Sequence, residues 1–158
     1  MTQELMNRFA RALENRDSAG LASCFTPDGV YDDYFFGPRQ GAEGIHDTVE
    51  HFYKGGREYR WDFTECAGDD KLAFASYNFS YVSNAPTAGS ERILFDGIAR
   101  LELRDGLIQR YSEVFDRGMA LAQQNFPPEQ VCKIVNRYAD NMRQRPEWAR
   151  HIKKDATP

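Results

Sequence analysis

The hydrophobic periodicity of this chain changes once, near Tyr59, and this change limits the possible folds more than any other feature. Before Tyr59, apolar residues recur every three or four positions, which is typical of amphipathic helices. From Tyr59 to Phe115, aromatic and aliphatic residues alternate with polar ones, as in strands that bury one face. Helices followed by a long antiparallel meander predict an α+β architecture.

Three helices and one strand are expected before the change of period. The helices cover residues 2–15, 19–25 and 41–53, with Asp17 or Ser18 as a cap for the second helix. Residues 30–36 are β-branched and aromatic, which predicts a strand that Gly37-Pro38 closes.

Turn residues divide the alternating part into strands. Gly68-Asp69-Asp70 predicts a turn, residues 84–89 predict a loop, and the Asp-Gly pair at 105–106 predicts a hairpin between strands 91–103 and 107–115. After Arg117 the helical period returns. A helix that begins at Pro127-Pro128 carries an apolar stripe made of Val131, Ile134, Val135, Tyr138 and Met142.

Length and composition indicate one domain with its own core. The chain has 158 residues, 41% of them hydrophobic, and a domain has roughly 100–200 residues. No stretch approaches the ~20 apolar residues of a membrane span, and the N-terminus lacks a signal peptide's apolar run. Cys24, Cys66 and Cys132 are widely spaced and odd in number, which favours buried free thiols in a cytoplasmic protein over disulfides or a metal site.

The charge is distributed unevenly along the chain. The net charge is −4, but residues 126–158 carry seven Lys and Arg against four Asp and Glu, so residues 1–125 are at −7 and the tail at +3. The acidic balance argues against nucleic acid as a partner. The basic tail could dock on the acidic body, dock on a second subunit, or form a solvated helix face.

The motifs of several enzyme classes are missing. The chain has no GxGxxG, Walker loop, HExxH or GxSxG pattern. His46 and His51 are five positions apart, which does not fit a metal pair on one helix face, and His151 lies in the tail. A metal-free and cofactor-free acid/base site or a plain binding pocket remains.

Three segments together resemble the nuclear-transport-factor-2-like superfamily, and within it the SnoaL-like and ketosteroid-isomerase-like branches. The opening, residues 6–33, is similar to the first part of these domains; Gly41-Ala42-Glu43-Gly44-Ile45 with Phe52-Tyr53 resembles their third helix; and Arg104-Asp105-Gly106-Leu107-Ile108 leading to Phe115-Asp116 resembles their last hairpin. Residues 1–125 would therefore form the SnoaL-like domain, and residues 126–158 a helical C-terminal extension of it.

The resemblance implies a cone-shaped, curved antiparallel sheet packed on the three N-terminal helices, a cystatin-like α+β roll. The open end of the cone would leave an apolar pocket between sheet and helices. Such a pocket with a few polar groups is the usual form of a small-molecule site. Related domains commonly pair through the outer sheet face, which implies a homodimer. The tail would pack against the protein body, where it can roof the pocket.

The resemblance also implies site residues. Asp33 matches the catalytic base of ketosteroid isomerases near the end of the first strand, and Tyr31 shares its face. Both oxyanion donors of that enzyme are missing, because Phe9 replaces a tyrosine and Gly97 or Ala99 replaces an aspartic acid. SnoaL-like cyclases are similar in placing an acid on a late strand, and Glu113 takes that place.

Two functions stay open at this point. In the first, Asp33 and Glu113 catalyse proton transfer on a small, mostly apolar carbonyl or hydroxyl compound, as in an isomerase, cyclase, dehydratase or hydrolase. In the second, the domain binds a small apolar or cyclic ligand, or dimerises, without chemistry. In both, the expected ligand-binding residues are aromatic: Phe9, Tyr31, Phe35, Phe52, Trp61, Phe79, Tyr111 and Phe115.

Overall fold

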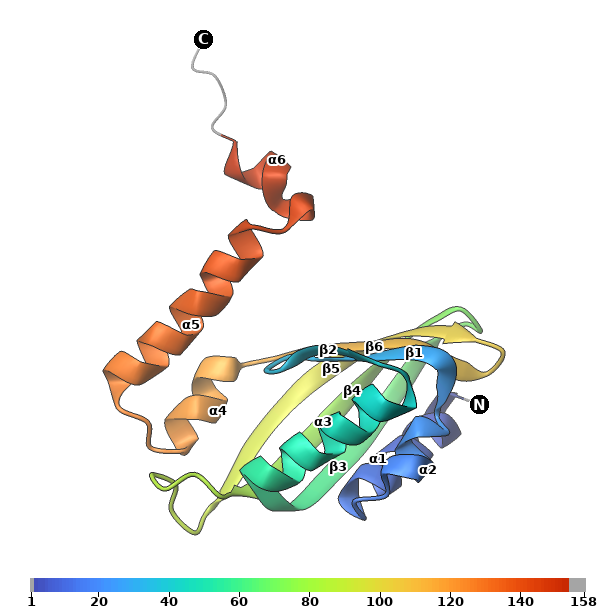
Figure 1. Ribbon diagram of the computed structural model, residues 1–158, viewed down its shortest axis with the longest axis horizontal. Helices are drawn as coiled ribbons and strands as arrows, with labels where there is room; N and C mark the ends of the chain where they lie inside the picture. Colours follow the sequence, from blue (N-terminus) through green and yellow to red (C-terminus); the bar gives the residue numbers. More distant parts are fainter. Residues whose placement is uncertain (1, 154–158) are drawn as a thin grey trace.

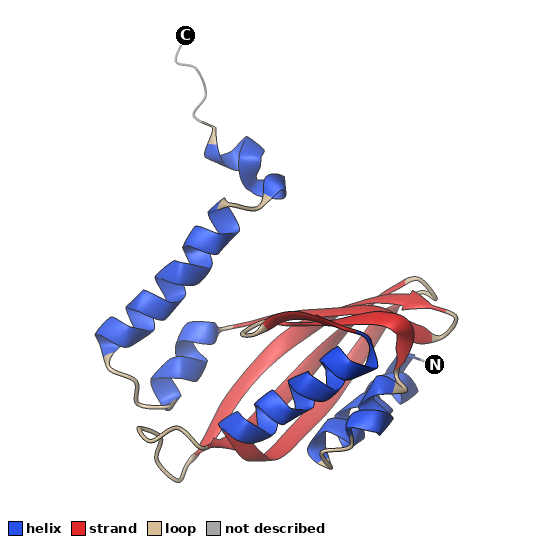
Figure 2. Ribbon diagram, in the orientation of Figure 1, coloured by secondary structure: helices blue, strands red, loops and turns tan. Residues whose placement is uncertain are grey.

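A curved six-stranded sheet forms the body of the protein, and three helices lie on the side toward which it curves (Figures 1 and 2). The computed structural model describes residues 2–153. The strands are β1 (Phe25–Asp33), β2 (Gly37–Gln40), β3 (Gly56–Gly68), β4 (Leu72–Ser83), β5 (Arg92–Arg104) and β6 (Leu107–Phe115). The helices are α1 (Thr2–Glu14), α2 (Ser18–Ala22), α3 (Gly41–Gly55), α4 (Arg117–Gln123), α5 (Pro128–Arg143) and α6 (Ala149–Ile152), with a 3₁₀ turn η1 (Pro146–Trp148).

This arrangement confirms the predicted α+β class and the curved sheet on three N-terminal helices. The strand order is β2-β1-β6-β5-β4-β3. One pairing differs from the expected antiparallel sheet, because β1 lies parallel to β6. The antiparallel run from β3 to β6 fixes the direction of β6, and β1 joins its free edge in that same direction.

The region between residues 23 and 40 departs furthest from the predicted elements. Helix α2 ends at Ala22, and β1 already begins at Phe25. Pro27-Asp28-Gly29 does not end an element but forms an irregularity inside β1, where its register against β6 shifts between Phe25 and Val30. Strand β2 was not predicted; Gly37, with a φ of 80°, turns the chain so that this short strand pairs back on β1.

The N-terminal helix is anchored by one aromatic ring at the centre of the core. Phe9 is fully buried, and its ring centroid lies 5.7 Å from that of Tyr31, 5.0 Å from Tyr111 and 5.3 Å from Trp61. Aromatic pairs at such distances contribute roughly 0.5–1.5 kcal/mol beyond the burial of their area. Phe9 therefore joins α1 to both halves of the sheet.

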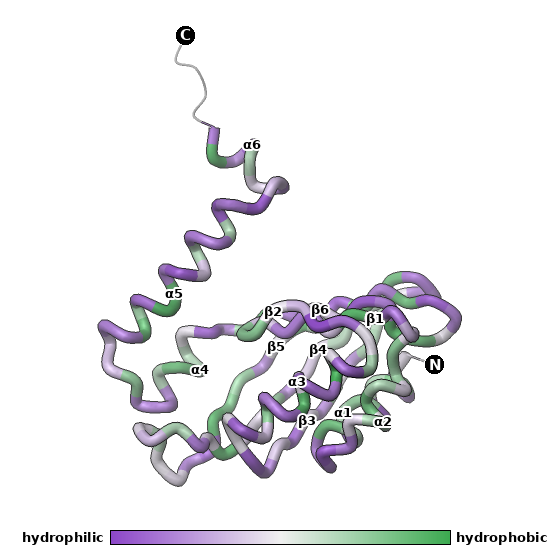
Figure 3. The backbone as a smooth tube through the Cα atoms, in the orientation of Figure 1, coloured by the Kyte–Doolittle hydropathy of each residue, from purple (hydrophilic) through white to green (hydrophobic). Residues whose placement is uncertain are grey.

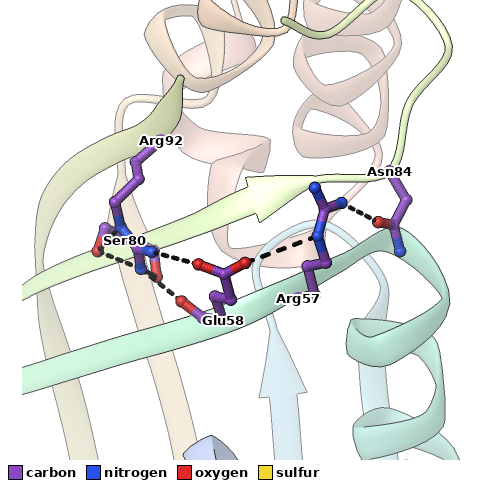
Figure 4. Close-up of polar contacts among 5 residues, drawn as sticks. All are labelled: Arg57, Glu58, Ser80, Asn84 and Arg92. Atoms are coloured by element: carbon purple, nitrogen blue, oxygen red, sulfur yellow. Dashed lines mark hydrogen bonds and ion pairs between the residues drawn. The ribbon is translucent and has the colours of Figure 1, made fainter. Parts of the chain in front are cut away.

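A bulge in β3 re-aims the strand where it leaves α3. Glu58 has a φ of 55°, and the register against β4 shifts between Arg57 and Arg60. Figure 4 shows the polar contacts there: the Glu58 carboxylate lies between Arg57 and Arg92, and Arg92 also donates to Ser80 of β4. The next residue, Tyr59, is buried, and its hydroxyl donates to the carbonyl of Phe52 at 2.5 Å. The bulge thus brings the end of α3 and the sheet together.

The C-terminal helices leave the body in two steps. Helix α4 is fixed to β5 by Gln123, whose side-chain amide donates to the carbonyl of Leu94 and accepts from its N–H. Helix α5 extends away from the cone (Figure 1). Hydrophobic and hydrophilic residues alternate along it (Figure 3). None of its residues is fully buried, although the hydroxyl of Tyr138 donates to the carbonyl of Phe35 at 3.4 Å.

The cysteines correct one expectation. All three are free, as predicted, but only Cys24 is buried; Cys66 is half-buried and Cys132 is exposed on α5. Within residues 2–153, no helix combines the length and apolar character needed to cross a membrane. The predicted tail includes residues 154–158, which lie outside the described residues.

Truncation after Gln124 tests how the tail is held. We expect cooperative unfolding to persist with a melting temperature lower by a few degrees, because no side chain of α5 is fully buried. Fluorescence of an apolar dye should rise, since Ile134 and Tyr138 would leave the surface that they half-cover. Truncation after Gln144, which removes only η1 and α6, is the control and should change neither signal. Loss of cooperative unfolding in the shorter protein would contradict this description.

Candidate functional site

A cavity of about 330 Å³ opens between the sheet, the end of α3 and the C-terminal helices. Most of its wall is aromatic, and its polar groups are few: two carboxyls, one imidazole, one amide and one guanidinium besides tyrosine hydroxyls. The lining residues are Asp33, Phe35, Phe36, His51, Phe52, Gly55, Tyr59, Trp61, Phe79, Tyr81, Phe95, Glu113, Phe115, Leu121, Gln124, Phe126, Ile134, Arg137 and Tyr138.

Glu113 is held by two tyrosine hydroxyls. Tyr77 on β4 donates to Oε2 at 2.7 Å, and Tyr111 on β6 donates to the same oxygen at 2.8 Å. All three side chains are buried. Oε1 accepts no side-chain hydrogen bond from residues 2–153, and the backbone N–H of Tyr34 is a further donor that lowers the pKa of this carboxyl group.

Small residues on β5 make the Tyr77–Glu113 contact possible. Ala99 pairs with Glu113, and Gly97 pairs with Tyr77. A Cβ added at Gly97 would lie 2.4 Å from the hydroxyl oxygen of Tyr77, which means that the phenol occupies the space of the missing side chain. Tyr77 therefore reaches over β5 from β4 to β6.

Asp33 ends β1 and closes the turn that follows. Its Oδ1 accepts from the backbone N–H groups of Phe35 at 2.7 Å and Phe36 at 2.8 Å. This pattern is an Asx turn, which satisfies the backbone where the strand ends. The side chain is buried nonetheless, and Oδ2 makes no hydrogen bond within residues 2–153.

Burial makes both carboxyls weaker acids. The pKa of Asp33 is raised from 3.8 to about 6 by desolvation, against which the two backbone N–H groups and Arg117 act. The pKa of Glu113 is raised from 4.5 to about 8, first by desolvation and then by the charge of Asp33, while the tyrosine hydroxyls lower it. At neutral pH, Glu113 is therefore mostly protonated and Asp33 mostly ionised.

The cavity brings together only part of the residue set predicted from the sequence. Asp33, Glu113, Phe35, Phe52, Trp61, Phe79 and Phe115 all line it. Phe9, Tyr31 and Tyr111 do not; their stacked rings fill the core beneath it, where they are fully buried. Tyr31 and Tyr111 lie on the inward face of the sheet, and Phe9 of α1 stacks on both of them. Helix α1 thus covers this part of the face, and only the part beyond α1 is left open.

Several lining or supporting residues were not predicted. Tyr77 carries a signal in its alternation with Phe79, opposite the small residues of β5. His51, interpreted as structural, lines the mouth, with its ring centroid 5.4 Å from that of Phe36. Arg137 and Tyr138 come from α5; Tyr138 belongs to the apolar stripe for which packing against the body was expected, whereas Arg137 carried no such signal.

Arg117 connects the tail to the edge of the site. Its guanidinium carbon lies 3.2 Å from the ring centroid of Tyr34 and 3.8 Å from that of Tyr138, and it donates to the carbonyl of Tyr34. Burial lowers the pKa of Arg117, whereas Tyr34 and Tyr138 act in the opposite direction. Stacking between two rings places a cation where water solvates it poorly, which strengthens cation–π attraction.

Within residues 2–153, His, Cys, Asp and Glu side chains form no group of three or more that could hold a metal ion. The donors of the cavity are two carboxyls with raised pKa values and one histidine, and neither carboxyl contacts His51.

Comparisons with known proteins identify the family. Residues 6–111 match the model of the SnoaL-like domain, and the chain belongs to this family. A comparison with curated proteins found no match.

Solved structures share the fold at low sequence identity. A protein from Catenulispora acidiphila with a ketosteroid isomerase-like fold, in complex with trimethylamine, has a TM-score of 0.70 and 18% identity, over 78% of this chain and 94% of that one. A proposed polyketide cyclase from Xanthomonas campestris has a TM-score of 0.64 and 18% identity, over 77% of this chain and 94% of that one. An LEH-like epoxide hydrolase from M. tuberculosis has a TM-score of 0.62 and 16% identity, over 78% of this chain and 88% of that one.

The raised pKa values predict how stability depends on pH. Between about pH 4 and 8 the folded protein binds more protons than the unfolded chain, so the free energy of unfolding should fall as the pH rises. Each unit of pKa shift corresponds to about 1.4 kcal/mol. Glu113→Gln should remove most of the fall between pH 6 and 8, because an amide does not titrate there.

Urea unfolding at pH 5, 6, 7 and 8 measures this dependence. Glu65→Gln is the matched control, because Glu65 is exposed on β3 and lies outside the cavity. A steep fall between pH 6 and 8 that persists in Glu113→Gln would show that another group is responsible.

Proposed function

We propose that this protein is a cofactor-independent acid/base enzyme that acts on a small, mostly apolar carbonyl compound. The observation that carries the proposal is the pair Asp33 and Glu113, which line one aromatic cavity with pKa values on either side of neutrality. Two titratable groups with pKa values pushed apart by their surroundings define a base and an acid. Asp33 is the base and Glu113 the acid.

The reaction step follows from these two states. The Asp33 carboxylate takes a proton from the carbon beside the carbonyl, and the C–H electron pair moves into an enol. Glu113 donates its proton, or a hydrogen bond, to the carbonyl oxygen, which supplies the oxyanion stabilisation that Phe9 and Gly97 do not. Tyr77 and Tyr111 hold the Glu113 carboxyl group in place. Asp33 then delivers its proton to a different carbon of a conjugated enol, the enol O–H proton returns to Glu113, and the carbonyl re-forms, which completes an isomerisation.

A non-catalytic binding domain is the second candidate function. The hydrogen bonds of Asp33 favour it, because an aspartate that closes an Asx turn has a structural role without any chemistry. The indole N–H of Trp61 is buried and has no partner within residues 2–153, and it suits a ligand acceptor in either function.

Deuterium exchange into 2-tetralone separates the two candidates. This bicyclic ketone has acidic C–H groups beside its carbonyl, and NMR in D₂O follows their exchange. The wild type should accelerate exchange with a bell-shaped pH profile between about 6 and 8. Glu113→Gln and Asp33→Asn should each lower the rate by roughly 10²–10⁴, and Glu65→Gln should not. No acceleration over buffer would favour the binding domain.

We also propose that two copies pair through the outer face of the sheet. Leu94, Ile98 and Val114 are 57%, 50% and 56% exposed there, and Ile98 lies directly opposite Val114 on β6. Exposed apolar side chains grouped on one face are typical of an interface. Light scattering should give a dimer for the wild type and a monomer for Ile98→Glu. A monomeric wild type would contradict the proposal.

A further inference from the structure

The charges of the cavity are separated between its interior and its mouth. Asp33 and Glu113 lie among the aromatic rings, and both are buried. Arg137, which is exposed on α5, and His51, which is exposed on α3, are the only basic residues among the described ones that line the cavity. An anion deep inside would meet two carboxyl groups, whereas an anion at the mouth would meet a guanidinium.

Arg137 has no acidic ion-pair partner among residues 2–153. Within residues 2–153 it makes no ion pair, in contrast to Arg104, which pairs with Asp28, and Arg110, which pairs with Asp32. Its guanidinium carbon is 5.7 Å from the ring centroid of Tyr138, the neighbouring residue that also lines the cavity. The charge is thus kept at the mouth and is not neutralised there.

We propose that Arg137 is a specificity-determining residue and that the cavity takes aromatic or alicyclic carboxylates. The ring system of such a ligand would lie among the aromatic walls, and its carboxylate would lie on Arg137, whose planar fork matches two carboxylate oxygens. This inference rests on the use of the cavity as a ligand site and adds the charge of the ligand. Helix α5 lies beyond the family match at residues 6–111. The preference for carboxylates would therefore be a property of the tail of this chain.

Two probes of equal size and different charge test the inference. Calorimetry at pH 7 and low salt compares 2-naphthoate, which carries a carboxylate, with 2-naphthamide, which is neutral. The wild type should bind 2-naphthoate roughly tenfold more tightly, a difference of about 1.4 kcal/mol. Arg137→Gln should remove this preference, so that the two probes bind with equal affinity. Arg143→Gln, which removes the same charge from the same helix away from the cavity, should keep the preference.

Three results would overturn the inference. They are equal affinities for the two probes in the wild type, a preference that survives Arg137→Gln or is lost equally in Arg143→Gln, and no binding of 2-naphthoate at millimolar concentration. The assay measures binding without turnover, so its result is independent of the exchange experiment. A protein that prefers 2-naphthoate but does not exchange 2-tetralone would retain this inference and lose the proposed enzyme activity.

Discussion

The carboxyl group of Glu113 is the constraint on which the site depends. Transferring an ionised carboxylate into an apolar interior costs far more than a domain's net stability, so a buried acid keeps its proton or finds donors. Glu113 does both: two tyrosines donate to Oε2, and the pKa of the group is raised to about 8. The buried site therefore favours the neutral form of Glu113, which is also the form that can donate a proton.

The geometry around Glu113 is a property of three strands and not of one residue. Tyr111 lies two positions before it on β6, but Tyr77 has to reach from β4 across β5. Gly97 and Ala99 leave that path open, and a larger residue at either position would displace the phenol or the carboxyl. Small residues usually weaken a strand, but in β5 they make room for a buried hydrogen bond between Tyr77 and Glu113.

The helices and strands with a clear local hydrophobic period could be predicted from the sequence. The change of period near Tyr59 predicted the helices and the meander, whereas Asp33 and Glu113 came from the resemblance to ketosteroid isomerases and SnoaL-like cyclases. Sequence reasoning missed β2 and the parallel contact of β1 with β6, because a four-residue strand has almost no period and because pairing between distant edges leaves no local signal. It also could not separate core from cavity: Tyr31 and Tyr111 alternate along their strands as Phe79 does, and only the position of α1, which carries Phe9, decides which rings stay uncovered.

The tail and the acid/base pair share one short segment, residues 33–36. From inside, Asp33 holds this turn through the N–H groups of Phe35 and Phe36; from outside, Arg117 holds the ring and carbonyl of Tyr34. The other face of the same guanidinium carries Tyr138 of α5, which donates to the carbonyl of Phe35. A shift of α5 would therefore move Arg117, whose charge lowers the pKa of Asp33. The helix that brings Arg137 to the mouth thus also contacts Arg117, the residue whose charge lowers the pKa of the base inside the cone.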